Sequence, residues 1–133
     1  MKKKDPVWID ERDVMAIHDR LLALHGGAAG LRDQGLLQSA LARPRQHHAY
    51  SRDADWLKLA GIYIAAIIQN HPFVDGNKRT AFAALFMFLA LNGMEFEPPE
   101  VDATVTMLRL AAGEMSDDDF TTWVRNNTRS RGA

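Results

Sequence analysis

The sequence predicts a single all-α domain. Its 133 residues are the size of one domain, and a hydrophobic content of 47% is ample for one core. Apolar residues recur at the spacing of a helix along nearly the whole chain. No linker, repeat or low-complexity tract divides it. We therefore expect one domain over residues 1–133, built from about six helices, with fraying confined to residues 1–6 and 127–133.

The first two predicted helices each follow an aspartate that can cap them. The first helix begins after Asp10 and ends at Gly26. The second begins after Asp33 and is expected to end at Pro44, because proline lacks the N–H that an interior helix position donates. Residues 43–53 are then expected to form a polar connection.

The two helices in the middle of the chain are predicted to be the most buried. Apolar side chains occupy nearly every face of residues 56–69 and of residues 77–91, which is typical of a helix surrounded by protein. The second of these helices is expected to stop at Asn92-Gly93. These two helices and the join between them should therefore form the centre of the domain.

The last third of the chain predicts one short extended piece and two more helices. Residues 94–97 alternate apolar and acidic side chains, a pattern that indicates an extended segment. A helix over residues 100–112 and a final helix after Ser116 complete the set. The three aspartates at positions 117–119 are expected to complement the dipole of the final helix rather than to bind a metal.

Composition and charge exclude several functional classes. Sixteen basic and seventeen acidic residues give a net charge of −1, so we expect no direct nucleic-acid binding by this chain alone. The absence of cysteine excludes disulfides, thiol catalysis and thiolate metal sites. No apolar run has membrane-spanning length, and no apolar secretory segment follows the lysines at the start. We expect a soluble cytoplasmic protein.

Polar chemistry is concentrated in the join between the two central helices, residues 71–80. Within ten residues this join holds five different polar groups between apolar neighbours. They are the imidazole of His71, the carboxylate of Asp75, the carboxamide of Asn77, the ammonium of Lys78 and the guanidinium of Arg79. Because buried helices flank the join, these groups should be held on a rigid support.

The end of this join predicts a phosphate site. Gly76 allows the backbone to approach a ligand closely. Asn77 opens the following helix, whose unpaired N–H groups and positive dipole end attract anions. Lys78 adds a point charge, and Arg79 adds a planar fork that matches phosphate oxygens.

The beginning of the join predicts a base and a metal ligand. A neutral His71 can accept a proton from an attacking hydroxyl. Asp75 is a hard oxygen ligand suited to Mg²⁺. Pro72 fixes the direction of the chain, and Phe73 is expected to anchor the loop in the core. A base, a metal ligand and an anion cradle are the minimum set for transfer from a nucleoside triphosphate.

Each part of this set also has an ordinary structural explanation. Asp75-Gly76 is a common turn pair, His71 suits a helix C-terminus, and Lys78-Arg79 suits a solvated surface. The complete string indicates chemistry because its chance occurrence is far rarer than that of any part. It is not a Walker A loop, since the GxxxxGK[ST] spacing is absent.

The string resembles the HxFx[D/E][A/G]N[G/K]R signature of the Fic/Doc family. It runs His71-Pro72-Phe73-Val74-Asp75-Gly76-Asn77-Lys78-Arg79. Weaker similarity to the Doc (death-on-curing) branch covers most of the chain. The resemblance implies an all-α Fic fold with this loop at its centre. It also implies functional roles: His71 as the general base, Asp75 as the Mg²⁺-associated acid, and Gly76, Asn77, Lys78 and Arg79 as the groups that hold the phosphates of ATP.

Two positions separate this chain from most of the family. Most Fic enzymes transfer AMP, and they carry glycine where this chain has Lys78 and arginine where it has Phe82. Both differences match the Doc branch, which uses ATP to phosphorylate a threonine hydroxyl of elongation factor Tu and so arrests translation. The resemblance therefore implies a toxin kinase. An AMP transferase with the same site residues remains an alternative, as does a catalytically silent helical binding module.

The resemblance also implies a protein partner. The inhibitory string [S/T]xxxE[G/N] of many Fic proteins is absent from this chain. Doc toxins are instead neutralised by a small antitoxin, Phd, so we expect a Phd-like helix in a hydrophobic groove. The sequence does not assign that groove. The predicted connection over residues 43–53 is a candidate for a flap that docks the protein substrate.

Overall fold

The computed structural model describes residues 5–51 and 55–131 and confirms an all-α fold. The helices are α1 (Glu11–His25), α2 (Gln34–Tyr50), α3 (Trp56–Asn70), α4 (Asn77–Leu91), α5 (Glu100–Ala111) and α6 (Asp117–Asn126). The strands β1 (Met94–Phe96) and β2 (Thr128–Ser130) form a small antiparallel pair. In this part of the chain no helix is long and apolar enough to cross a membrane.

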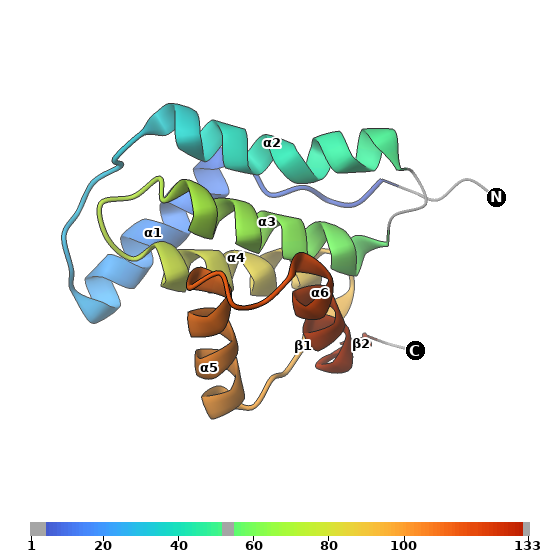
Figure 1. Ribbon diagram of the computed structural model, residues 1–133. Helices are drawn as coiled ribbons and strands as arrows, with labels where there is room; N and C mark the ends of the chain where they lie inside the picture. Colours follow the sequence, from blue (N-terminus) through green and yellow to red (C-terminus); the bar gives the residue numbers. More distant parts are fainter. Residues whose placement is uncertain (1–4, 52–54, 132–133) are drawn as a thin grey trace.

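Helices α3 and α4 lie side by side at the centre of the molecule, as predicted (Figure 1). Helix α3 packs against α2 on one side and against α6 on another, while α4 also contacts α1. Eight residues of α3 are buried: Leu59, Ala60, Gly61, Tyr63, Ile64, Ala65, Ala66 and Ile67. Burial on several faces explains why its sequence shows no polar stripe. The α3–α4 loop leaves this core at the same end as the α1–α2 connection (Figure 1).

The segment before α1 is held against the core. Pro6 and Ile9 are buried, so the expected fraying does not apply to Pro6, while residues 1–4 lie outside the described part. The hydroxyl of Tyr63 donates to the Ile9 carbonyl at 3.3 Å, and its ring packs against Trp8. Burial raises the pKa of Tyr63 to about 12, which keeps this donor protonated.

Helix α2 continues through Pro44, so the prediction that it ends there is wrong. Pro44 is buried inside the helix, which runs to Tyr50. The residues on either side of Pro44 bind other parts of the fold. Arg43 donates to Gln69 and Asn70 of α3 at 3.0 and 2.9 Å, and Arg45 lies over the Trp8 ring. These tertiary contacts outweigh the hydrogen bond that proline removes.

The predicted connection over residues 43–53 is therefore helical as far as residue 50. Residues 52 and 53 lie outside the described part. Arg43, at the start of this stretch, is bound to α3, and the role of the stretch as a substrate-docking flap stays a prediction.

The C-terminal residues also differ from the expectation of a frayed end. Thr128–Ser130 pairs with Met94–Phe96, which confirms the extended piece expected near residue 94. Arg129 forms an ion pair with Glu95 at 3.1 Å. Backbone pairing and cross-strand charge therefore hold residues 128–130, and residues 132–133 lie outside the described part.

Candidate active site

His71 ends α3 in a backbone conformation that is rare for a residue with a side chain. Its φ of 50° and ψ of 56° are left-handed, and it is the one non-glycine residue with positive φ in the part of the chain that the structure describes. Arg32 stabilises this turn by donating to the carbonyl of His71 at 2.7 Å and to that of Asn70 at 3.0 Å. The left-handed residue ends the helix and leaves the imidazole exposed.

Two buried residues hold the loop that follows. Phe73 is fully buried, as predicted, and Pro72 is buried beside it. The carboxamide of Asn77 accepts from the N–H of Phe73 at 3.0 Å and donates to its carbonyl at 2.9 Å. The Asn77 side chain is thus committed to closing the loop. Its predicted part in phosphate binding depends on its backbone N–H at the start of α4.

A glycine-rich segment between α1 and α2 pairs with this loop, and sequence reasoning missed it. The N–H of Val74 donates to the carbonyl of Gly30 at 3.0 Å, and the N–H groups of Arg32 and Asp33 donate to the carbonyl of Pro72. Residues 28–33 therefore lie directly against the signature loop. The one sequence signal was a cluster of glycines, of which Gly30 has a φ of 120°.

Helix α4 begins without a side-chain cap. Its N-cap is Gly76, with a φ of 81° and no side-chain hydrogen bond to the first turn. The first N–H groups of an α-helix have no partners within the helix, so they are available to an anion here. Lys78 and Arg79 follow in this first turn with exposed side chains. Positive charge at this end of a helix opposes the dipole, and a bound anion would relieve the conflict.

Asp75 lies beside this helix start with its carboxylate exposed. One carboxylate oxygen accepts from the N–H of Gly76 at 2.8 Å, and the other accepts from the N–H of Ala28 at 3.2 Å. Each oxygen keeps lone pairs for a cation. Mg²⁺ commonly takes one or two carboxylates and completes its shell with water and phosphate oxygens, so a lone Asp75 fits it. Over residues 5–51 and 55–131 no group of three histidine, aspartate or glutamate side chains forms a self-sufficient metal site.

A cavity of about 520 Å³ brings the predicted functional groups together. Its polar lining consists of the residues predicted as base, metal ligand and phosphate cradle: His71, Asp75, Gly76, Asn77, Lys78 and Arg79. Ile68, Val74 and Ala111 supply apolar walls. The volume is within the range of small-molecule sites. The arrangement can hold a polyanion at the start of α4, in the same cavity as an exposed imidazole.

A second, mainly apolar groove of about 700 Å³ adjoins this cavity. Lys78 and Arg79 line both spaces and mark their common border. The apolar lining comes from three helices and includes Leu21 of α1, Phe82 and Phe86 of α4, and Met107 and Leu108 of α5. Phe82 thus faces the groove, and the cavity has no second arginine at that position.

Comparison with known proteins places this site in a family. A model of the Fic/DOC family matches residues 8–89, which include the whole loop and the start of α4. The chain belongs to the Fic/DOC family. It is 34% identical over 110 residues to "Protein kinase doc" of Escherichia phage P1, a match that covers 81% of this chain and 85% of that protein.

A second Fic/DOC relative is also named for Doc. The chain is 41% identical over 91 residues to "Toxin Doc" of Mycolicibacterium smegmatis (strain ATCC 700084 / mc(2)155), a match that covers 66% of each chain. The resemblance to Doc toxins that the loop predicts is therefore confirmed.

Proposed function

We propose that this protein is a toxin kinase that transfers the γ-phosphate of ATP to a threonine hydroxyl of elongation factor Tu. The observation that carries the proposal is the cavity in which His71 and the uncapped start of α4 meet. The name of the phage relative, a protein kinase, supports phosphate transfer. The name of the mycobacterial relative, a toxin, supports growth arrest as the outcome. We place the protein in the cytoplasm, with its substrate.

Each group in the cavity has one task in this reaction. The oxygen of the substrate hydroxyl forms a bond to the γ-phosphorus while the bond from that phosphorus to the β–γ bridging oxygen breaks, and ADP leaves. The proton of the hydroxyl passes to His71. The N–H groups at the start of α4, with Lys78 and Arg79, bind the phosphate oxygens and stabilise their charge. Asp75 would hold Mg²⁺, which would supply further positive charge to the phosphates.

Phosphate transfer is favoured over AMP transfer by the residues at two positions. Lys78 adds bulk and charge at the border of the cavity, and Phe82 offers no group that binds phosphate. A nucleotide bound with its γ-phosphate toward His71 fits both. An enzyme that transfers AMP is the second candidate, because the same histidine and helix start would serve it.

The test uses ATP labelled at either the γ- or the α-phosphate, together with Mg²⁺ and purified elongation factor Tu. We expect label on the protein from the γ position alone. The variant His71→Ala should lose about 10²–10⁴-fold in rate, which is typical of a missing general base. His47→Ala is the matched control, because His47 lies on α2 and outside the cavity.

The other outcomes of this test identify the alternatives. Transfer from the α position alone would show an AMP transferase. No transfer from either position, combined with harmless expression in bacteria, would favour the silent binding module. No transfer combined with toxic expression would mean a different target protein.

We also propose that a Phd-like antitoxin inserts a helix into the groove beside the cavity. The groove is mainly apolar and is lined by three helices, which suits the apolar face of an amphipathic helix. Phe86 on its wall is 41% exposed, and a helix seated in the groove would cover it. Phe86→Glu should abolish capture by the co-expressed antitoxin. Leu91→Glu should retain it, because Leu91 is similarly exposed on α4 but lies outside the groove.

A further inference from the structure

His18 of α1 is buried directly against the signature loop. Its side chain is among the largest that the described part of the fold buries completely, and the residue is 2% exposed. The imidazole stacks on the ring of Phe73 with 3.8 Å between centroids and 9° between planes. Its Nε2 lies 2.9 Å from the backbone carbonyl oxygen of Asp75. The reaction proposed above gives this histidine no role.

The hydrogen bond to Asp75 fixes both the state of the ring and a peptide plane. A carbonyl oxygen only accepts, so Nε2 of His18 carries the proton and donates. The plane that contains this carbonyl also contains the N–H of Gly76, because the peptide unit is rigid. That N–H donates to the Asp75 carboxylate at 2.8 Å. His18 therefore sets the direction of the donor that orients the carboxylate.

The turn that follows α1 holds the same carboxylate from its other side. The N–H of Ala28 donates to Asp75 Oδ2 at 3.2 Å. Gly27 has a φ of 117°, and a Cβ there would lie 2.7 Å from Oδ2. Only glycine leaves room for this approach. Asp75 is thus held at its carbonyl by α1 and at its carboxylate by the turn after α1.

We infer that His18 is a positioning residue for Asp75, which it orients as the ligand of the Mg²⁺ that accompanies ATP. This inference rests on the proposed function for the identity of the cation and the nucleotide. The structural half, that His18 holds the loop at Asp75 and Gly76, stands on the contacts alone. His18 touches neither nucleotide nor substrate hydroxyl in this arrangement.

The experiment compares three variants. His18→Phe keeps a ring to stack on Phe73 and removes the donor, whereas His18→Gln replaces the ring and keeps an N–H donor. Tyr63→Phe is the matched control, because it also removes one donor from a buried ring to a backbone carbonyl, and Tyr63 lies outside the cavity. Two measurements are made: hydrogen exchange at the N–H groups of residues 73–76, and the affinity for ATP with Mg²⁺ and with EDTA.

For exchange, we expect His18→Phe to speed the loop N–H groups by about fivefold relative to the buried N–H groups of α3, the effect of one lost hydrogen bond. His18→Gln should stay closer to wild type, and Tyr63→Phe should not change the loop selectively. Equal exchange of the loop in His18→Phe and in Tyr63→Phe would overturn the inference.

For binding, we expect His18→Phe to lose most of the gain in ATP affinity that Mg²⁺ gives the wild type. Its affinity in EDTA should stay within about twofold of wild type, since the start of α4 is intact. Equal loss with and without Mg²⁺ would overturn the role at the cation. If the wild type itself gains nothing from Mg²⁺, the proposed function fails, and the exchange result still decides whether His18 holds the loop.

Discussion

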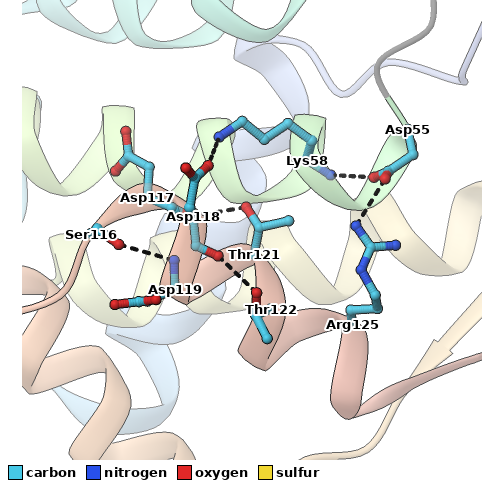
Figure 2. Close-up of polar contacts among 9 residues, drawn as sticks. All are labelled: Asp55, Lys58, Ser116, Asp117, Asp118, Asp119, Thr121, Thr122 and Arg125. Carbon is cyan, nitrogen blue, oxygen red and sulfur yellow. Dashed lines mark hydrogen bonds and ion pairs between the residues drawn. The ribbon is translucent and has the colours of Figure 1, made fainter.

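The N-termini of α4 and α6 are built in opposite ways. Figure 2 shows that Ser116 caps α6 by accepting the N–H of Asp119 at 3.0 Å, and that Asp118 pairs with Lys58 at 3.0 Å. Three aspartates complement the dipole of this helix, as predicted. Helix α4 instead begins at Gly76 without a side-chain cap and places Lys78 in its first turn.

The difference shows how a helix end becomes a binding site. In α6 the Ser116 side chain already occupies the N–H of Asp119, and the three carboxylates of the first turn would repel an anion. Helix α4 lacks both the cap and the acidic turn, so an added anion would complete it. Departure from the ordinary rules of capping is expected where a residue serves function rather than stability.

The largest expected effect is on transfer. The double variant with Lys78→Ala and Arg79→Ala should lose at least about 10²–10³-fold in transfer rate, because two groups that stabilise phosphate charge are removed. Its urea midpoint should remain near that of wild type, since both side chains are exposed. A rate within threefold of wild type would show that α4 does not hold the phosphates.

The next largest effect is on the stability of the loop that precedes α4. Asn77→Ala should lower the free energy of unfolding by roughly 2–4 kcal/mol, because it leaves the N–H and the carbonyl of buried Phe73 without partners. Urea denaturation measures this loss. A loss below about 0.5 kcal/mol would contradict the assignment of this side chain to loop closure.

Removal of the α6 cap should have a smaller and purely structural effect. Ser116→Ala should lower the free energy of unfolding by about 1 kcal/mol, the usual value for a lost N-cap. Ser116→Asp should restore most of it, because aspartate accepts the same N–H. The transfer rate of both variants, measured well below the melting temperature, should equal that of wild type. A reduced rate would mean that the two helix ends are coupled.

The smallest effect tests the unfavourable charge on α4 directly. Lys78→Gln should raise the free energy of unfolding by about 0.3 kcal/mol in low-salt buffer without phosphate, because one repulsion with the helix dipole is removed. Added phosphate should erase this advantage by stabilising the wild type more. If the variant is destabilised in both buffers, Lys78 has a structural partner that this explanation omits.

Local sequence was sufficient to predict the parts of the fold that depend on local physics. The cap at Asp10 is confirmed, and its carboxylate accepts the N–H of Asp13 at 3.0 Å. The apolar faces of α3 and α4 predicted their burial correctly. The groups of the cavity were found for the same reason: they are consecutive in the chain, so one loop brings them together.

Features that depend on distant contacts were not predictable in this way. The passage of α2 through Pro44 depends on contacts that Arg43 and Arg45 make with other elements. The hydrogen bond from His18 to Asp75 spans 57 positions of the chain and leaves no periodic pattern. From the sequence, His18 is only a histidine within a predicted helix. Its contact with Asp75 becomes visible only in the folded structure.

The central claim is that the uncapped N-terminus of α4 binds the phosphates of ATP. Its most direct test is a titration of isotope-labelled protein with Mg²⁺ and ATP, monitored through the N–H resonances at the N-termini of α4 and α6. We expect residues 76–79 to shift together with one half-saturation concentration, while residues 117–119 do not move. Inorganic phosphate should shift the same group more weakly. Shifts confined to other parts of the protein, or none at α4 at saturating ATP, would contradict the claim that this helix end holds the phosphates.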